Sequence, residues 1–176
     1  RLGNRSAAAA PSNIYRCSPG GPNDYVFIHC ATQEMWISLT RILGRPELGK
    51  DPRYEDRRDR VLFIDEIDAM ITAWTETRPK HEVLSILAGA GIPCGAVLDS
   101  AEVLSDPHLR QTGFITDLEH PRRGVYPMPG NPVKLADSPT DMVRAPLLGE
   151  HNAEVFGKLL GRTETDIETL RRDGVI

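Results

Sequence analysis

The sequence is poor in several features that mark particular classes of protein. Its three cysteines, Cys17, Cys30 and Cys94, form an odd set without CxxC spacing, which argues against a disulfide framework and favours a reduced, cytoplasmic protein. No apolar run approaches the roughly 20 residues needed to cross a bilayer, so we expect no membrane association. The net charge of -4 argues against a nucleic-acid-binding protein, which is usually strongly basic.

Motifs that mark common active sites are also missing. The sequence has no GxGxxG, no P-loop, no GxSxG and no zinc-ligand spacing. None of the five histidines has the spacing of a metal ligand relative to another histidine or a cysteine: His29, His81, His108, His120 and His151. We therefore expect no metal site. The residues alone indicate a soluble α/β module that is part of something larger.

Hydrophobic periodicity in residues 1–98 predicts a small, helix-rich α/β domain. Alternating segments at 14–17 and 25–28 flank a turn cluster and predict an antiparallel hairpin. Apolar stripes at helical spacing predict three helices, which cover residues 32–43, 63–74 and 79–90. Trp36 and Trp74 lie on two of these stripes and are expected to anchor the core between the helices. A short apolar run at 94–98 predicts one buried strand.

Residues 99–176 predict a proline-rich arm with little core of its own. Asp99 with Glu102 suits a capping box, and Asp106 before Pro107 suits a second helix start. Further patterns predict a hairpin over 114–128, a short strand at 133–135 and terminal helices at 152–160 and 163–173. Unless something covers them, these helices expose several apolar side chains, which would mark an interface: Val155, Phe156, Leu159, Ile167 and Leu170.

Three groups of residues could carry chemistry, and each has a simpler structural interpretation. Arginines of the segment 51–60 could meet the phosphates of a coenzyme, but interleaved acids favour a solvated, ion-paired helix start. Cys94 is expected to pack as a small apolar side chain whose pKa is raised by burial. Glu150 next to His151 could form an acid–histidine pair, or Glu150 could simply favour the positive end of the following helix.

Two segments resemble the family III CoA-transferases of the formyl-CoA transferase type. They are GIPCGAVLDSAEVLSDPHLRQTGF at 91–114 and APLLGEHN at 145–152, and they stand in the family's order. Relatives of the same fold include L-carnitine dehydratase, bile-acid-inducible protein and α-methylacyl-CoA racemase. The resemblance covers essentially the whole chain, but only the C-terminal part of the family's chain. The chain also starts with Arg1 rather than Met, and we expect a preceding part.

The resemblance implies an enzyme that moves coenzyme A from an acyl-CoA to a carboxylic acid. In the family an aspartate attacks the thioester, and that aspartate lies in the N-terminal part, so no catalytic residue is expected here and Asp99, Asp106 and Asp141 do not inherit the role. Coenzyme A enters as a thioester substrate, and no other cofactor is implied. The family fold joins a large and a small α/β domain in two interlocked chains. Residues 1–98 would be the small domain of this homodimer, and residues 99–176 would return to the large domain.

One active-site feature of the family maps onto this sequence. A run of glycines that closes over the active site precedes the first strand in formyl-CoA transferase, and the matching residues here are Ser6, Ala7, Ala8 and Ala9. Alanine pays about 1–2 kcal/mol in the left-handed backbone conformations that glycine adopts freely. The loop should therefore sample fewer conformations, which argues against the formyl/oxalate substrate pair more than against the family.

Two other functions stay open at this point. An α-methylacyl-CoA racemase would share the fold and abstract an α-proton with residues that also lie upstream. A non-catalytic dimerisation or interaction module is the alternative from a different class. The sequence does not name the acyl donor or the acceptor.

Overall fold

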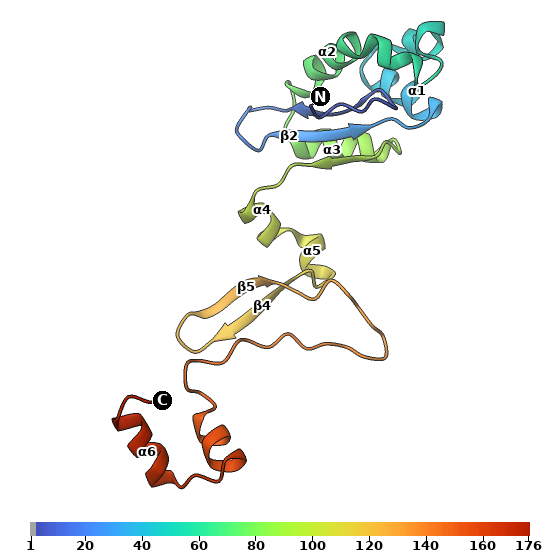
Figure 1. Cartoon of the computed structure of the whole chain (residues 1–176). Coiled ribbons are helices and arrows are strands. Elements are labelled where there is room, and N and C mark those ends of the chain that lie inside the picture. The colour runs from blue at the N-terminus through green and yellow to red at the C-terminus, as the bar shows by residue number, and fades with distance from the viewer. Residues whose placement is uncertain (1–2) are drawn as a thin grey trace. The chain divides into compact units, whose positions relative to one another are not determined.

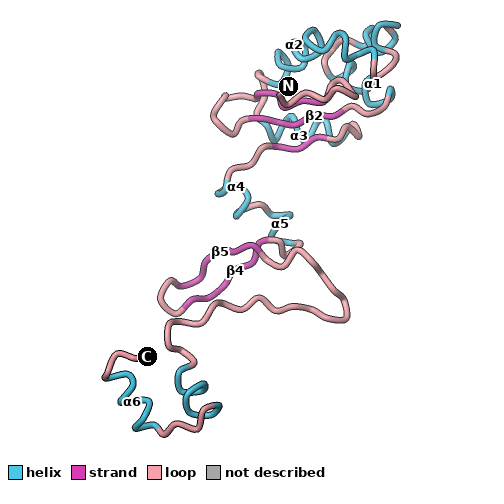
Figure 2. Tube along the Cα trace, in the orientation of Figure 1, coloured by secondary structure: helices cyan, strands magenta, loops and turns pink. Residues whose placement is uncertain are grey.

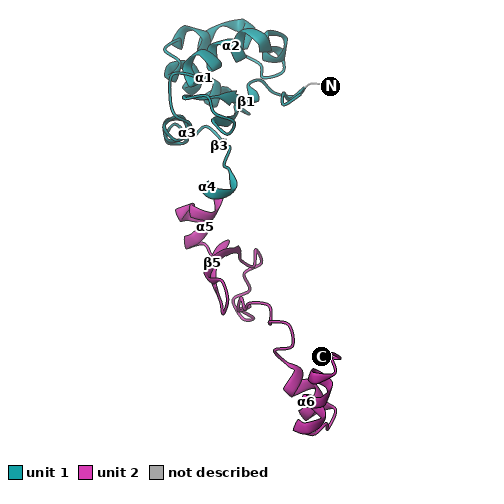
Figure 3. Cartoon of the chain, turned by 90° about the vertical axis from the view of Figure 1, so that its left-hand side faces the viewer, with its two compact units in different colours: residues 1–102 teal, residues 103–176 magenta. Residues whose placement is uncertain are grey.

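The computed structural model describes residues 3–176 and divides the chain into two compact units, residues 1–102 and residues 103–176 (Figure 3). The boundary falls inside the short helix α4, Ser100–Ser105. The assignment of residues 1–98 and 99–176 as the small domain and the returning arm of a larger enzyme stays a prediction.

A three-stranded antiparallel sheet runs through the first unit in the order β1-β2-β3 (Figure 1). Its strands are β1 Ser12–Arg16, β2 Tyr25–His29 and β3 Cys94–Ala96. The predicted hairpin is confirmed, with Tyr15 opposite Val26. Because side chains alternate along a strand, Val26 and Ile28 are fully buried on one face, while Phe27 on the other face is 40% exposed.

Helices α1 Gln33–Ile42, α2 Ile64–Thr75 and α3 Lys80–Gly89 confirm the three apolar stripes. Capping residues mark the start of α1 and the ends of α1 and α3. The Thr32 hydroxyl accepts the Met35 N–H and caps α1, and Gly44 with φ 72° follows its end. Gly91, with φ 73°, ends α3 in the same way. Together these helices and β2 enclose one buried cluster.

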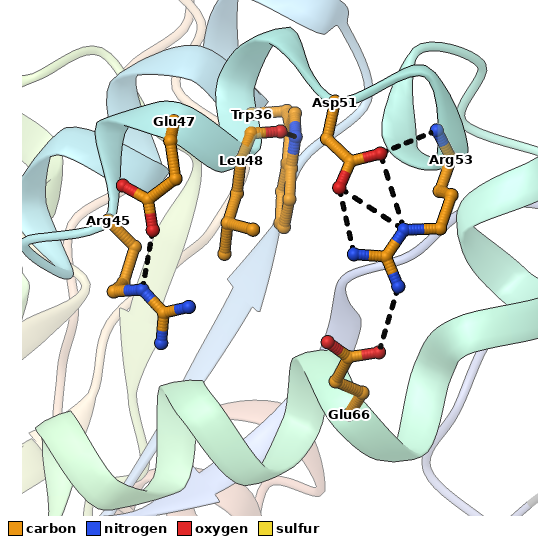
Figure 4. A network of polar contacts seen from close by, with 7 residues as sticks. All are labelled: Trp36, Arg45, Glu47, Leu48, Asp51, Arg53 and Glu66. Carbon is orange, nitrogen blue, oxygen red and sulfur yellow. Dashed lines mark hydrogen bonds and ion pairs between the residues drawn. The ribbon is translucent and has the colours of Figure 1, made fainter.

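Short 3₁₀ helices link α1 to α2: η1 Pro46–Lys50, η2 Pro52–Tyr54 and η3 Asp59–Phe63. Fully buried Trp36 donates its indole N–H to the Leu48 carbonyl at 3.1 Å (Figure 4). Beside it, Arg53 bonds Asp51 at 2.8 Å and lies 3.8 Å from Glu66. Trp36 is thus a core anchor as predicted, and Trp74 is only partly buried at the margin of the same cluster.

Lys80 joins three segments of the first unit. Its side chain is 7% exposed, and its ammonium donates to the carbonyls of Asn23 and Val97 at 3.1 and 2.8 Å and to Glu102 Oε2 at 2.8 Å. Glu102 also accepts the Asp99 N–H while Asp99 accepts the Glu102 N–H, so the predicted capping box is confirmed.

The second unit contains α5 Pro107–Gln111 and the two-stranded antiparallel sheet of β4 Ile115–His120 and β5 Gly124–Pro129. A long segment without helix or strand follows (Figure 2). It leads to η4 Ala153–Leu159 and α6 Glu164–Arg172. No helix among the described residues is long and apolar enough to span a bilayer.

Two expectations from the sequence need correction, and two others are refined. Residues 133–135 form no strand, because no described strand pairs with them and the Val133 N–H bonds the Asn131 side chain instead. The 94–98 run forms a shorter strand that is only half-buried, because β3 is an edge strand. The helix at 152–160 is a π-helix, with the Leu160 N–H bonding the Val155 carbonyl. Ile167 is 7% exposed because η4 covers it.

Candidate functional site

The four residues predicted to cover the active site form one loop directly before β1. Ser6 is half-buried, Ala7 and Ala8 are exposed, and Ala9 is buried. The Ser6 hydroxyl accepts the Ala8 N–H at 3.1 Å, and the Ser6 N–H reaches the Ser12 carbonyl at 3.2 Å. The centre of the loop, Ala7 and Ala8, is therefore exposed, whereas its two ends, Ser6 and Ala9, are partly or fully buried against the first unit.

Arg5 anchors the N-terminal end of this loop. Its guanidinium donates to Asp68 Oδ2 at 2.8 Å and lies 2.7 Å from Asp65 Oδ1. Both carboxylates belong to α2, where they stand three residues apart on neighbouring turns. The hydrogen bond to Asp65 and the charge of Asp68 raise the pKa of Arg5, so its charge is retained at any ordinary pH.

Asp68 is the hub of a buried polar network. It accepts hydrogen bonds from the Tyr15 hydroxyl at 2.6 Å, from Asn13 Nδ2 at 3.0 Å and from Arg5 Nε at 2.8 Å. Burial, and then the hydrogen bond to Asp68, raise the pKa of Tyr15 far above its usual value. Tyr15 is therefore a neutral donor that ties β1 to α2, and not an acid–base group.

Arg60 anchors the C-terminal end of the loop. Its side chain is fully buried. Its guanidinium donates to the Ala10 carbonyl at 2.8 Å, to Gln33 Oε1 at 2.6 Å and to the Tyr54 carbonyl at 2.8 Å. It also lies 5.3 Å from the ring centre of Trp36. Burial lowers the pKa of Arg60 from its usual value.

The prediction of a solvated, ion-paired segment at 51–60 is therefore right for Arg53 and wrong for Arg60. Arg53 is exposed and pairs with Asp51. Among the ion pairs of the described residues none includes Arg60, whose hydrogen-bond partners are oxygen atoms of uncharged groups. The reason is position, because Arg60 lies three residues before Phe63 and seven before Ile67 and so continues the apolar stripe inward.

The cysteines show no sign of nucleophilic activation. Burial raises the pKa of Cys17 to about 11 and that of Cys30 to about 12, and it also raises the pKa of Cys94, as expected. The Cys30 N–H donates to the Pro11 carbonyl just after the loop, so this residue supports the backbone there. All three thiols are free.

Glu150 and His151 do not form the acid–histidine pair that their adjacency suggested. Glu150 accepts hydrogen bonds from Arg144 at 2.8 Å and from the Leu147 N–H at 2.6 Å, and His151 lies 3.4 Å from Glu154. The contact with Arg144 lowers the pKa of Glu150 to about 2. Within residues 3–176, no three histidine, cysteine, aspartate or glutamate side chains gather as metal ligands.

The sequence did not single out Asp68 or the special place of Arg60. A signal for Asp68 was present in the pattern of the second helix. Asp68 stands beside Ile67 and three residues before Ile71 on the buried side of α2. A charged residue on an apolar helical face requires a partner, because its burial is otherwise costly.

The comparisons with known proteins agree on one family. The family model described as CoA-transferase family III matches residues 1–152. A formyl-CoA:oxalate CoA-transferase of Streptomyces coelicolor is 39% identical over 176 residues, which are 100% of this chain and 43% of that protein. One of Bradyrhizobium diazoefficiens is 36% identical over 177 residues, with 100% and 42% covered. The chain thus spans about two fifths of these relatives.

Solved structures show the same fold. The crystal structure of a CAIB/BAIF family protein from Brucella suis matches with a TM-score of 0.74 and 28% identity, over 90% of this chain and 40% of that one. A protein from Mycobacterium tuberculosis matches with a TM-score of 0.65 at 20% identity, over 82% and 40%. The mixed α/β fold with short antiparallel strands is confirmed, and the chain belongs to CoA-transferase family III.

Proposed function

We propose that the full-length protein moves coenzyme A from an acyl-CoA to a carboxylic acid, and that this chain is the C-terminal portion of that enzyme. The observation that carries the proposal is the match to formyl-CoA:oxalate CoA-transferases along all 176 residues at 39% identity. The active protein would be an interlocked homodimer in the cytoplasm. Exposed apolar side chains on the terminal helices support an intersubunit or interdomain cover, among them Leu159 at 75% and Leu160 at 60% exposure.

The proposed reaction runs through a carboxylate nucleophile that lies upstream of this chain. The carboxylate attacks the thioester carbonyl, which breaks the C–S bond, releases the coenzyme A thiolate and forms a mixed anhydride. The thiolate then attacks the aspartyl carbonyl, which releases the donor carboxylate and leaves an aspartyl-CoA thioester. The acceptor carboxylate repeats these steps in reverse, so the aspartate is regenerated and no net proton is consumed.

In this scheme the loop Ser6–Ala9 has the task of excluding water. Both the anhydride and the aspartyl thioester are open to hydrolysis, so transfer needs a cover that closes over them. The loop contributes no ionisable side chain, and its one hydroxyl, that of Ser6, is engaged by the Ala8 N–H. Its contribution would be shape and closure, while the chemistry would come from groups upstream.

The acyl donor and acceptor are proposed only as an acyl-CoA and a carboxylic acid. The resemblance described above implies a run of glycines in formyl-CoA transferase where this loop has Ser6 and three alanines. Each β-carbon restricts the backbone, and Ala7 and Ala8 place methyl groups on the exposed centre of the loop. This supports a donor and acceptor pair other than formyl-CoA and oxalate.

A two-arm assay on the purified full-length protein tests the proposal. One arm offers a panel of acyl-CoA donors, including formyl-CoA, with a panel of acceptor acids, including oxalate, and measures new acyl-CoA by mass. The other arm incubates branched acyl-CoA in deuterium oxide without an acceptor. New acyl-CoA in the first arm supports the transferase. Exchange at the α-carbon in the second arm, without transfer in the first, would replace it by the racemase.

A further inference from the structure

Arg60 is an unusual residue to find inside a small domain. Its side chain is fully buried, and the only groups that it bonds among the described residues are neutral. A buried ionic group without a counter-charge generally stabilises a fold less than an apolar side chain of the same volume. The guanidinium must therefore supply something that an apolar side chain does not.

The guanidinium fixes the relative positions of three segments of the chain by hydrogen bonding to each of them. Arg60 Nε reaches the Ala10 carbonyl at the end of the loop, and Nη1 reaches both Gln33 at the start of α1 and the Tyr54 carbonyl at the end of η2. A planar fork with fixed donor directions can hold three acceptors in one arrangement, which a lysine ammonium does not do. Trp36, 5.3 Å away, covers the guanidinium from the core.

The other end of the loop is held independently. Arg5 is paired with Asp65 and Asp68 in the first turns of α2, which follows η3 without a break. Between Arg5 and Ala10 only the four residues Ser6–Ala9 remain without such an anchor. Movement of the loop is thereby confined to its exposed centre, as a cover with two fixed ends requires.

We propose that Arg60 is a positioning residue for the loop Ser6–Ala9, which it holds in place through the Ala10 carbonyl and, behind it, Gln33 and Tyr54. This inference rests on the proposed function of the loop as an active-site cover. Arg60 does not touch substrate in this proposal. It decides where the cover closes, and therefore how much of the activated acyl group is lost to water.

Variants of the full-length protein test the proposal, beginning with Arg60→Met. Two readouts are used: the ratio of transfer to hydrolysis of the acyl-CoA, and amide hydrogen exchange of residues 5–12. We expect the ratio to fall by about 10- to 100-fold, since small displacements in an active site can cost that much. We expect exchange of residues 5–12 to accelerate by about 10-fold, because the C-terminal anchor is gone.

Three further variants separate positioning from general stability. Arg58→Met changes an exposed arginine of the same segment and should alter neither readout. Val83→Ala opens a cavity at a fully buried position of α3 and should lower the melting temperature while leaving the ratio unchanged. Arg60→Lys keeps the charge without the fork, and should leave the transfer-to-hydrolysis ratio as low as in Arg60→Met.

The outcomes are distinguishable from failure of the proposed function. If the wild-type protein transfers no coenzyme A, the proposed function fails, and hydrogen exchange of residues 5–12 still decides whether Arg60 holds the loop. Unchanged exchange in Arg60→Met would overturn the inference. A transfer-to-hydrolysis ratio equally low in Val83→Ala, or fully restored by lysine at position 60, would also overturn it.

Discussion

Replacing Asp68 by alanine would remove the common acceptor of three donors, and the structure lets the cost be divided among them. Tyr15 is 2% exposed, so its hydroxyl would be left buried without its acceptor, at about 1–3 kcal/mol. The Arg5 side chain is 34% exposed and can be hydrated by water when Asp68 is absent. Losing the bond between Arg5 and Asp68 therefore costs less free energy of unfolding than losing the bond to Tyr15. We expect Asp68→Ala to lower the free energy of unfolding by about 3 kcal/mol in total.

The double-mutant cycle with Tyr15→Phe is the sharper test. Tyr15→Phe alone should cost about 1 kcal/mol, because Asp68 keeps two other donors. With phenylalanine in place no hydroxyl is left unsatisfied, so Asp68→Ala should then cost about 1–2 kcal/mol less than in the wild type. Equilibrium urea unfolding, followed by the fluorescence of Trp36 and Trp74, measures the stability of all four proteins.

Asp65→Ala is the matched control, since this neighbouring carboxylate bonds the same Arg5 but its side chain is 88% exposed. It should cost less than about 1 kcal/mol. The network reasoning would be refuted if Asp68→Ala cost no more than Asp65→Ala. It would also be refuted if the effects of Asp68→Ala and Tyr15→Phe simply added, within about 0.5 kcal/mol.

Three other predictions concern the loop, the second unit and the isolated chain. If the loop Ser6–Ala9 covers the active site as proposed, replacing it by four glycines in the full-length protein should raise hydrolysis relative to transfer, because the loop gains backbone freedom; unchanged kinetics with several acceptors would leave the loop a purely structural role. Arg144→Met should raise the pKa of Glu150 from about 2 toward 4.5, measured by carboxyl carbon NMR. Since the folded pKa is lowered, the stabilisation by this contact is present above about pH 4.5 and disappears as the pH falls through about 2; a Glu150 pKa unmoved by the variant would refute the role of Arg144. The isolated 176-residue chain should transfer no coenzyme A in a mass-based assay, because the proposed mechanism places the nucleophile upstream of it, and turnover by the pure chain would contradict that mechanism.

Local signals predicted most elements of the fold. The caps at Thr32, Asp99 and Asp106 each bond a backbone N–H three residues later, so the local sequence is enough to predict them. The same holds for the capping box at Thr163 with Asp166, which begins α6. What failed was the strand at 133–135, because a strand depends on a partner elsewhere and no local signal supplies one.

The candidate site was predictable only in part. The position of the loop Ser6–Ala9 came from the resemblance to a family, and no pattern of its own residues would have indicated it. Its anchors came from the structure, since Arg60 meets Ala10 across 50 residues and Arg5 meets Asp68 across 63. A sequence shows that a charge stands on an apolar face, but it does not show which distant carbonyl or amide that charge will meet.

That separation along the chain has a consequence for synthesis on the ribosome. The loop Ser6–Ala9 emerges well before the residues that hold it, because Arg60 follows Ala10 by 50 positions and Asp68 follows Arg5 by 63. At roughly 5–20 residues per second, the nascent loop waits about 3–13 seconds for its second helix. During that interval the segment has neither anchor, so it is open to proteases and chaperones. Any slowing of synthesis between the emergence of the loop and the emergence of Asp68 would lengthen this exposure.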